Sequence, residues 1–180
     1  MWFKEDDSMV HQRKEYRLKH YDYSSPNSYF ITICIKNRQP ILWQNVLHQD
    51  NGDVGAPIGR PVTYTLSPYG NVVDTAINNI PRIYPNVNVD KYVVMPNHIH
   101  LILTIRDKSE NHSADIANIV NKMKGYVSRQ IGFSPWQKLY YDRIIRDEEE
   151  YNNKIRYIEE NPAKWTEDDE YINLQCYKNG

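Results

Sequence analysis

Three stretches of the chain carry the residue types and the alternation that β-strands favour. Tyr29–Ile35 is rich in β-branched and aromatic residues, which predicts a strand. Val87–Met95 predicts a second strand, and Pro96-Asn97 predicts a turn into a third strand that begins at His98. Because side chains alternate between the two faces of a strand, one face of the third strand is expected to pack into a core. That face carries Ile99, Leu101, Leu103 and Ile105.

Two segments place apolar residues at helical spacing between recognisable start and stop signals. Ser67 is a predicted N-cap with Pro68 at the first helical position, and Pro81 is predicted to end this helix. Ser113 is predicted to cap the next helix, which Gly132 ends. Each helix has one apolar face, formed by Val72, Val73, Ala76, Ile77 and Ile80 in the first and by Ile116, Val120, Met123, Val127 and Ile131 in the second.

The last part of the sequence predicts an extended segment followed by a helix. Trp136–Ile145 is aromatic and is expected to be extended in part. Asp147 is a predicted N-cap of a helix that runs to about Glu160, because Pro162 disfavours helical geometry at Asn161. Helices interleaved with strands in this order predict an α+β fold, a ferredoxin-like α/β sandwich with a central, mainly antiparallel sheet.

Length and composition are those of one globular domain. We expect a single domain over residues 1–180, with a mobile loop near 49–62, where three glycines and two prolines cluster. No apolar run approaches the roughly 20 residues of a membrane span. Met1–Glu15 lacks the apolar region of a signal peptide, and two cysteines give no disulfide framework. These features predict a cytoplasmic protein with no membrane partner.

The pair His98 and His100 is the strongest chemical signal in the sequence. Both side chains belong to one face of the predicted third strand, roughly 7 Å apart along the chain. Neutral imidazole is a common metal ligand, so the pair could form half of a divalent-metal site. From spacing alone, two hydrogen-bonded structural histidines are an equally good interpretation. The histidine-triad nucleotide hydrolases are a poor match, because they need a third histidine where this chain has Ile102.

The predicted last helix offers groups that could complete such a site. Tyr157 and Asn161 are four residues apart, so they share one face of the helix. A phenolic hydroxyl one turn from an amide oxygen could lie beside one metal ion. Spacing alone favours a structural alternative, in which Tyr157 packs at the edge of the core and Asn161 only ends the helix.

Several blocks of sequence occur along nearly the whole chain in a specific order and spacing. They are Arg17-Leu18, Tyr21-Asp22-Tyr23, Tyr29 to Cys34, Leu66-Ser67-Pro68-Tyr69-Gly70, Val93 to His100, Trp136-Gln137, Tyr140 to Arg146, Tyr157 to Pro162, and Trp165. Together these blocks resemble the single-tyrosine HUH transposases, and most closely the REP-associated tyrosine transposases of bacteria.

This resemblance implies a fold of the HUH endonuclease type and a transposase that nicks and rejoins single-stranded DNA. Tyr157 would be the nucleophile that forms a 5′-phosphotyrosine intermediate. His98, His100 and Asn161 would bind the divalent metal, Mg²⁺ or Mn²⁺, although relatives often have glutamine at the third position. The implied substrate is DNA hairpins formed by palindromic repeats, cut in association with the bacterial nucleoid.

Basic residues gather in one part of a chain whose formal net charge is only −1. The segment from Lys122 to Arg146 contains six basic residues and a single acid. Tyr126 lies among them and is an alternative nucleophile, although the family motif does not place the nucleophile there. We expect phosphate contacts from Lys122, Lys124, Arg129, Arg143, Arg146 and Arg17, with solvated surface positions as the alternative.

Two alternatives to this enzyme remain open at the level of sequence. One is a non-catalytic, domesticated relative that binds hairpin DNA without cutting it. The other is a metal phosphoesterase that uses water as its nucleophile and is unrelated to DNA. The intact set of His98, His100, Tyr157 and Asn161 favours the nicking enzyme. Relatives act as monomers or as homodimers, and we expect a monomer here.

Overall fold

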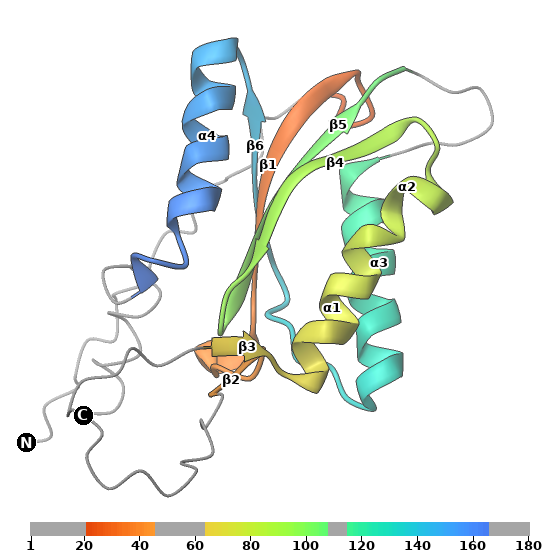
Figure 1. Cartoon of the computed structure of the whole chain (residues 1–180). Coiled ribbons are helices and arrows are strands. Elements are labelled where there is room, and N and C mark those ends of the chain that lie inside the picture. The colour runs from red at the N-terminus through yellow and green to blue at the C-terminus, as the bar shows by residue number, and fades with distance from the viewer. Residues whose placement is uncertain (1–20, 46–63, 108–114, 166–180) are drawn as a thin grey trace, which may run out of the picture.

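The computed structural model describes residues 21–45, 64–107 and 115–165 (Figure 1). Its centre is a four-stranded antiparallel sheet in the order β4-β5-β1-β6. Helices cover both faces of this sheet (Figure 1), so the predicted α+β sandwich is confirmed. The strands are β1 (Asn27–Cys34), β4 (Val87–Val94), β5 (His98–Ile105) and β6 (Tyr141–Ile145). The helices are α1 (Pro68–Asn78), α2 (Ile80–Ile83) and α3 (Ile116–Ile131) on one face and α4 (Glu148–Glu160) on the other.

The sheet separates two hydrophobic clusters of different size. The larger cluster lies between the sheet and helices α1 and α3, and it contains the predicted core face of β5, Ile99 to Ile105. The smaller cluster lies beneath α4 and consists of Phe30, Ile102, Ile145 and Ile158. His98 and His100 share the face of Ile102, because side chains alternate along β5. Both histidines therefore belong to the layer that α4 covers.

Two helix boundaries differ from those predicted. Helix α1 ends at Asn78, and Pro81 lies in the first turn of the short helix α2 rather than ending the first helix. Proline is tolerated there because the first amides of a helix have no intrahelical partner. Helix α3 is capped by Asp115, whose carboxylate accepts a hydrogen bond from Ala117 N, and not by Ser113, which lies outside the described residues. Asp115 is adjacent to the first apolar residue of the helix, which favours it as the cap.

The other helix ends follow the predicted signals. Ser67 Oγ accepts a hydrogen bond from Gly70 N, and Asp147 Oδ1 accepts one from the first turn of α4. Gly132 ends α3 in the left-handed conformation at φ 83°, where residues with a side chain are strained. At Gly70, in the first turn of α1, glycine is required for a steric reason. A Cβ atom there would collide with the carbonyl oxygen of Leu42.

Small elements connect the main ones. A turn of 3-10 helix, η1 (Lys36–Arg38), follows β1, and β2 (Trp43–Asn45) pairs with β3 (Tyr64–Leu66). Strands of three residues are too short to show alternation, so the sequence did not predict them. The predicted loop near 49–62 lies outside the described residues, and the single domain over 1–180 stays a prediction. In the part of the chain that the structure describes, no helix is long and apolar enough to span a membrane.

Candidate active site

The two histidines face each other at the beginning of β5. The His98 and His100 side chains are both buried, and their Nε2 atoms are 2.9 Å apart. The strand pairing places Thr32 of β1 opposite His100 and Cys34 opposite His98. The predicted common face of the two imidazoles is therefore formed by the geometry of the strand itself, supported by the neighbouring strand.

Hydrogen bonds on the far side of each ring orient the two imidazoles. His98 Nδ1 lies 2.8 Å from Asn97 Oδ1, an atom that only accepts, so Nδ1 carries the hydrogen and Nε2 presents its lone pair. His100 Nδ1 lies 2.8 Å from Thr32 Oγ1, and a hydroxyl can donate or accept. Thr32 can therefore support either tautomer of His100, including the one in which both Nε2 lone pairs point to the same place.

Burial keeps both histidines neutral. Loss of solvent lowers the pKa of His98 well below its ordinary value, and the neighbouring His100 and Arg38 lower it further. Loss of solvent also lowers the pKa of His100 to about 3, with an added effect from the positive charge of Lys154. Neutral imidazole is the form that binds metal ions, so the pair is ready for ligation at neutral pH.

Helix α4 brings Tyr157 to the histidines. The Tyr157 hydroxyl lies 3.4 Å from His100 Nε2, and its ring packs edge-on against those of His100 and Phe30. The next residue, Ile158, is buried in the cluster beneath the helix and fixes the position of α4 on the sheet. Tyr157 is nevertheless 42% exposed, so part of this residue is open to solvent.

Asn161 ends α4 one turn after Tyr157, and its backbone N–H donates to the Tyr157 carbonyl at 3.1 Å. The Asn161 side chain is buried, and although the residue has other interactions, its Oδ1 atom accepts no hydrogen bond among the described residues. A buried amide oxygen is stabilised by a donor or a cation. The ring of Trp165 also lies near His98, with 6.0 Å between the ring centroids.

The two imidazole nitrogens are spaced as two ligands of one divalent cation would be. Two ligands at right angles, each about 2.1 Å from an ion, lie about 3 Å apart, which matches the separation of the two Nε2 atoms. The described residues contain no group of three or more His, Cys, Asp or Glu side chains that could hold an ion. A metal held here therefore needs an amide, water or phosphate oxygen beside the two imidazoles.

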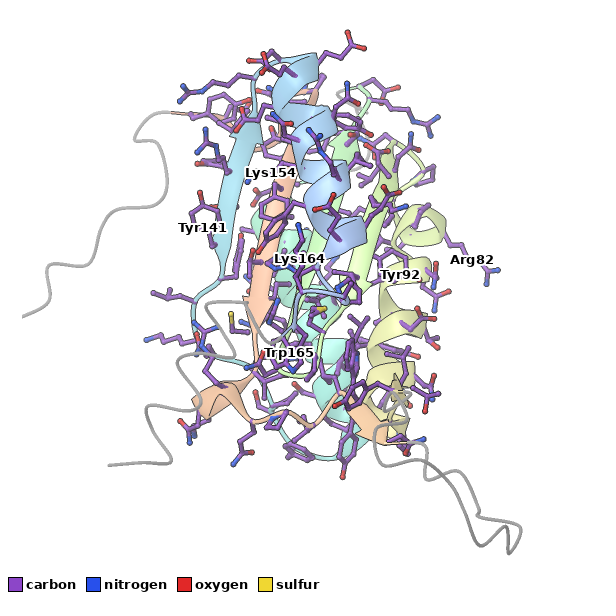
Figure 2. The ribbon with its side chains drawn as sticks, turned by 60° about the vertical axis from the view of Figure 1, so that its left-hand side comes forward. Arg82, Tyr92, Tyr141, Lys154, Lys164 and Trp165 are labelled. Carbon is purple, nitrogen blue, oxygen red and sulfur yellow. The ribbon has the colours of Figure 1, made fainter. Side chains whose placement is uncertain are left out.

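Lys154 is a residue of this site that the sequence analysis missed. It precedes Tyr157 by three residues and so shares its helix face. Its Nζ atom lies 4.5 Å from the centre of the Phe30 ring and 5.7 Å from that of Tyr157. Burial lowers the pKa of Lys154, and the positive charge of Arg143 adds to this effect. Figure 2 shows Lys154 on the side of the molecule that also carries Lys164 and Trp165. The three-residue spacing between Lys154 and Tyr157 was the signal in the sequence that could have identified Lys154 as a residue of this site.

The basic helix α3 lies on the opposite side of the sheet from the histidines (Figure 1). Tyr126 packs against the larger hydrophobic cluster there, so the sheet separates this alternative nucleophile from the histidine pair. Lys124 Nζ donates to two backbone carbonyls of residues 137–138, at 2.8 and 3.2 Å, which gives it a structural role. Lys122 and Arg129 are exposed, and the DNA contacts expected of all three basic residues stay predictions.

Two further basic residues expected to contact DNA are close to α4. Arg143 and Arg146 are exposed, at the end of the chain segment that leads into this helix. Arg143 Nε forms an ion pair with Glu150 of α4 at 2.5 Å. Arg17, the remaining predicted contact, lies outside the described residues.

The chain was compared with known proteins, and no family model matches it. A Haemophilus influenzae protein described as uncharacterized is 33% identical over 185 residues, which cover 91% of this chain and 95% of that protein. A second H. influenzae protein, provisionally named a REP-associated tyrosine transposase, is 25% identical over 112 residues, covering 55% of this chain and 62% of that protein.

A solved structure of a REP-associated tyrosine transposase bound to a REP hairpin has a similar fold. The TM-score is 0.58 at 19% sequence identity, over 82% of this chain and 74% of that one. The resemblance that the sequence blocks indicated is therefore confirmed, in fold by this structure and in sequence by the shorter match.

Proposed function

Because this chain belongs to the same family as the 33% identical H. influenzae protein and has the fold of a REP-associated tyrosine transposase, we propose that it nicks and rejoins single-stranded DNA at hairpin sites. One observation carries the proposal, which is the Tyr157 hydroxyl 3.4 Å from His100 Nε2, beside the second imidazole of His98. A nucleophile next to metal-binding nitrogens is the arrangement that metal-assisted phosphoryl transfer needs.

In the proposed reaction, the phenolic oxygen of Tyr157 forms a bond to the scissile phosphorus. The bond between phosphorus and the 3′-oxygen breaks, and the phenolic proton passes overall to that oxygen through solvent. The products are a 5′-phosphotyrosine and a free 3′-hydroxyl. Because the phosphodiester is kept in the covalent link, another 3′-hydroxyl can attack it and rejoin the strands without an external energy source.

The metal-binding residues in this proposal are His98, His100 and Asn161. Bound Mg²⁺ or Mn²⁺ would polarise the scissile phosphate and neutralise charge on the departing 3′-oxygen. An ordinary tyrosine has a pKa near 10 and is a weak nucleophile at neutral pH. Lys154 Nζ lies 5.7 Å from the centre of the Tyr157 ring, where its positive charge would stabilise the negative charge that develops during attack on the phosphate. The proposal also uses one chain per site, because Tyr157 and the two histidines meet within a single chain.

The test uses hairpin oligonucleotides from the DNA that flanks the gene, labelled at either end. They are incubated with the protein and Mg²⁺ or Mn²⁺ and then separated on a denaturing protein gel. We expect the 3′-labelled DNA to move with the protein, because the tyrosine keeps the 5′-phosphate side of the cut. The 5′-labelled product should be released.

The covalent band should disappear with EDTA and in Tyr157→Phe, and it should persist in the matched control Tyr126→Phe. Cleavage without any covalent band would favour the phosphoesterase that uses water. Hairpin binding without cleavage would favour the non-catalytic DNA-binding protein. Either result contradicts the proposed function.

A further inference from the structure

An open pocket lies between η1 and the segment that leads to β6. Its volume is about 1000 Å³, and it is lined by Lys36–Arg38 on one side and by Ser134 and Trp136–Lys138 on the other. None of the residues that the catalytic proposal uses lines this pocket. A separate ligand, or a separate part of the substrate, could therefore occupy it.

The chemistry of the lining suits a nucleotide. Lys36, Arg38 and Lys138 are cationic, and no carboxylate is among the lining residues. Cations of this kind bind phosphates, while the amide side chains of Asn37 and Gln137 can donate to and accept from base edges. The lining thus combines groups for a phosphate backbone with groups for a base.

An exposed aromatic residue comes directly before the pocket wall in the chain and pairs with a second exposed aromatic residue. Phe133 directly precedes the lining residue Ser134 and is 46% exposed. It forms an edge-on pair with Tyr69, which is 39% exposed, with 5.6 Å between the ring centroids. Aromatic rings beside a cationic groove are typical of proteins that bind single strands, because unpaired bases stack on them.

The two walls of the pocket are joined by backbone hydrogen bonds. Lys36 N donates to the Pro135 carbonyl at 2.6 Å, and Gln137 N donates to the Cys34 carbonyl at 2.9 Å. Lys124 Nζ holds the carbonyl groups of residues 137–138 from the α3 side. These hydrogen bonds fix the two walls of the pocket relative to each other.

The cationic wall has a strained backbone. Asn37 and Arg38 adopt φ angles of 56° and 53°, in the left-handed region that side chains disfavour. Conformations of this kind are energetically costly and occur most often at functional sites. The strained turn is held by Asn97, whose Nδ2 donates to the Arg38 carbonyl at 3.2 Å.

The same asparagine connects the pocket to the histidine pair. Asn97 Oδ1 accepts the hydrogen bond from His98 Nδ1, and the Arg38 guanidinium donates to the Sγ atom of Cys34, the residue opposite His98 in β1. The pocket wall is thus joined to His98 through a single residue, so the nucleotides next to a scissile phosphate at Tyr157 and the histidines are the part of a strand nearest to the pocket.

We propose that this pocket binds a nucleotide of the single-stranded segment that adjoins the cleavage point. Lys36, Arg38 and Lys138 contact its phosphates, and Asn37 and Gln137 contact its base. The inference rests on the proposed function and deepens it, because it assigns a binding site to DNA outside both the hairpin and the reacting bond.

The experiment measures the affinity of the full chain for labelled hairpin oligonucleotides by fluorescence anisotropy over a range of salt concentrations. One hairpin is blunt, and two others carry a single-stranded extension on the 5′ or the 3′ side. The test variants are Lys36→Ala, Lys138→Ala and the double variant, all at exposed side chains. Arg82→Ala is the control, because Arg82 is exposed and projects from α2, away from α4 (Figure 2).

We expect the double variant to lose affinity for one extended hairpin and to bind the blunt hairpin as the wild type does. Each lost contact to a single strand should reduce the slope of log affinity against log salt by about 0.7. The slope for the double variant should therefore be smaller by about 1.4 than the slope for the wild type. Arg82→Ala should change neither value, and unchanged thermal unfolding would show that all variants are folded.

Equal affinity of wild type and double variant for every extended hairpin would overturn the pocket assignment, as would an equal loss for blunt and extended DNA. If the wild type still forms the covalent adduct in either case, the proposed function stands and only the pocket fails. A wild type that neither binds nor cuts any of the hairpins would overturn both.

Discussion

At the scale of single residues, the candidate site depends on neighbours that support the reacting groups. Thr32 fixes the ring of His100 from the adjacent strand, and Lys154 adds a positive charge beside Tyr157. Groups of this kind determine which nitrogen of a histidine faces an ion and how well negative charge is stabilised near a nucleophile. Two predictions follow from their geometry.

Thr32→Val should weaken Mn²⁺ binding by about 10- to 100-fold, because the His100 ring loses the hydrogen bond at Nδ1 that orients it. Isothermal titration calorimetry measures the affinity directly. Thr32→Ser keeps the hydroxyl and should bind Mn²⁺ nearly as the wild type does. Equal affinity of the valine and serine variants would show that the hydrogen bond has no role in metal binding.

Lys154→Gln should slow formation of the covalent adduct by about 10- to 100-fold while hairpin affinity changes little. Loss of the cation removes electrostatic stabilisation of the negative charge that develops on the phosphate in the transition state. Rates are measured in single turnover, with Lys154→Arg as the conservative variant that restores the charge. A rate in Lys154→Arg as low as that in Lys154→Gln would show that the positive charge has no role.

At the scale of elements, helix α4 carries Tyr157, Lys154 and Asn161 together and is attached to the sheet by a small cluster. Ile158 is its fully buried residue, and it packs with Phe30, Ile102 and Ile145. The N-terminus of α4 is fixed by Asp147, which caps it. Because Ile158 is the buried anchor of the helix and directly follows Tyr157, packing beneath it should control the distance from Tyr157 to His100.

Ile158→Ala should lower the free energy of unfolding by about 2–4 kcal/mol, since it leaves a cavity beneath α4, whereas Ile158→Val should cost only about 1 kcal/mol. Adduct formation should fall more in the alanine variant, while Mn²⁺ binding by the two histidines of β5 is largely retained. Urea unfolding and the gel assay measure the two effects. Undiminished adduct formation in a destabilised Ile158→Ala would contradict the role given to this packing.

At the scale of the whole molecule, the sequence predicted what depends on local pattern. The alternation around His98 and His100 was sufficient to assign them to one strand face, and the cap and proline signals located α4. The contact between Tyr157 and His100 depends on the packing of α4 against the sheet. The spacing of residues along the sequence does not determine this packing. The pocket likewise needs Lys36 and Pro135, far apart in sequence, to be hydrogen-bonded neighbours.

The arrangement of the whole chain also predicts that each site works alone. A mixture of His100→Ala and Tyr157→Phe should give no covalent adduct, because every reacting group of a site comes from one chain. The gel assay with equal amounts of both variants tests this, with each variant alone and the wild type diluted by one variant as controls. Adduct in the mixture would show that α4 is exchanged between subunits.

The most direct test of the central claim identifies the residue that carries the DNA. The protein is incubated with its hairpin and Mn²⁺, the bound DNA is digested with nuclease, and the tryptic peptides are analysed by mass spectrometry. The account predicts a nucleotide adduct on the peptide that contains Tyr157, and the unmodified form of the peptide that contains Tyr126. A nucleotide on Tyr126 or another tyrosine, with Tyr157 unmodified, would contradict it.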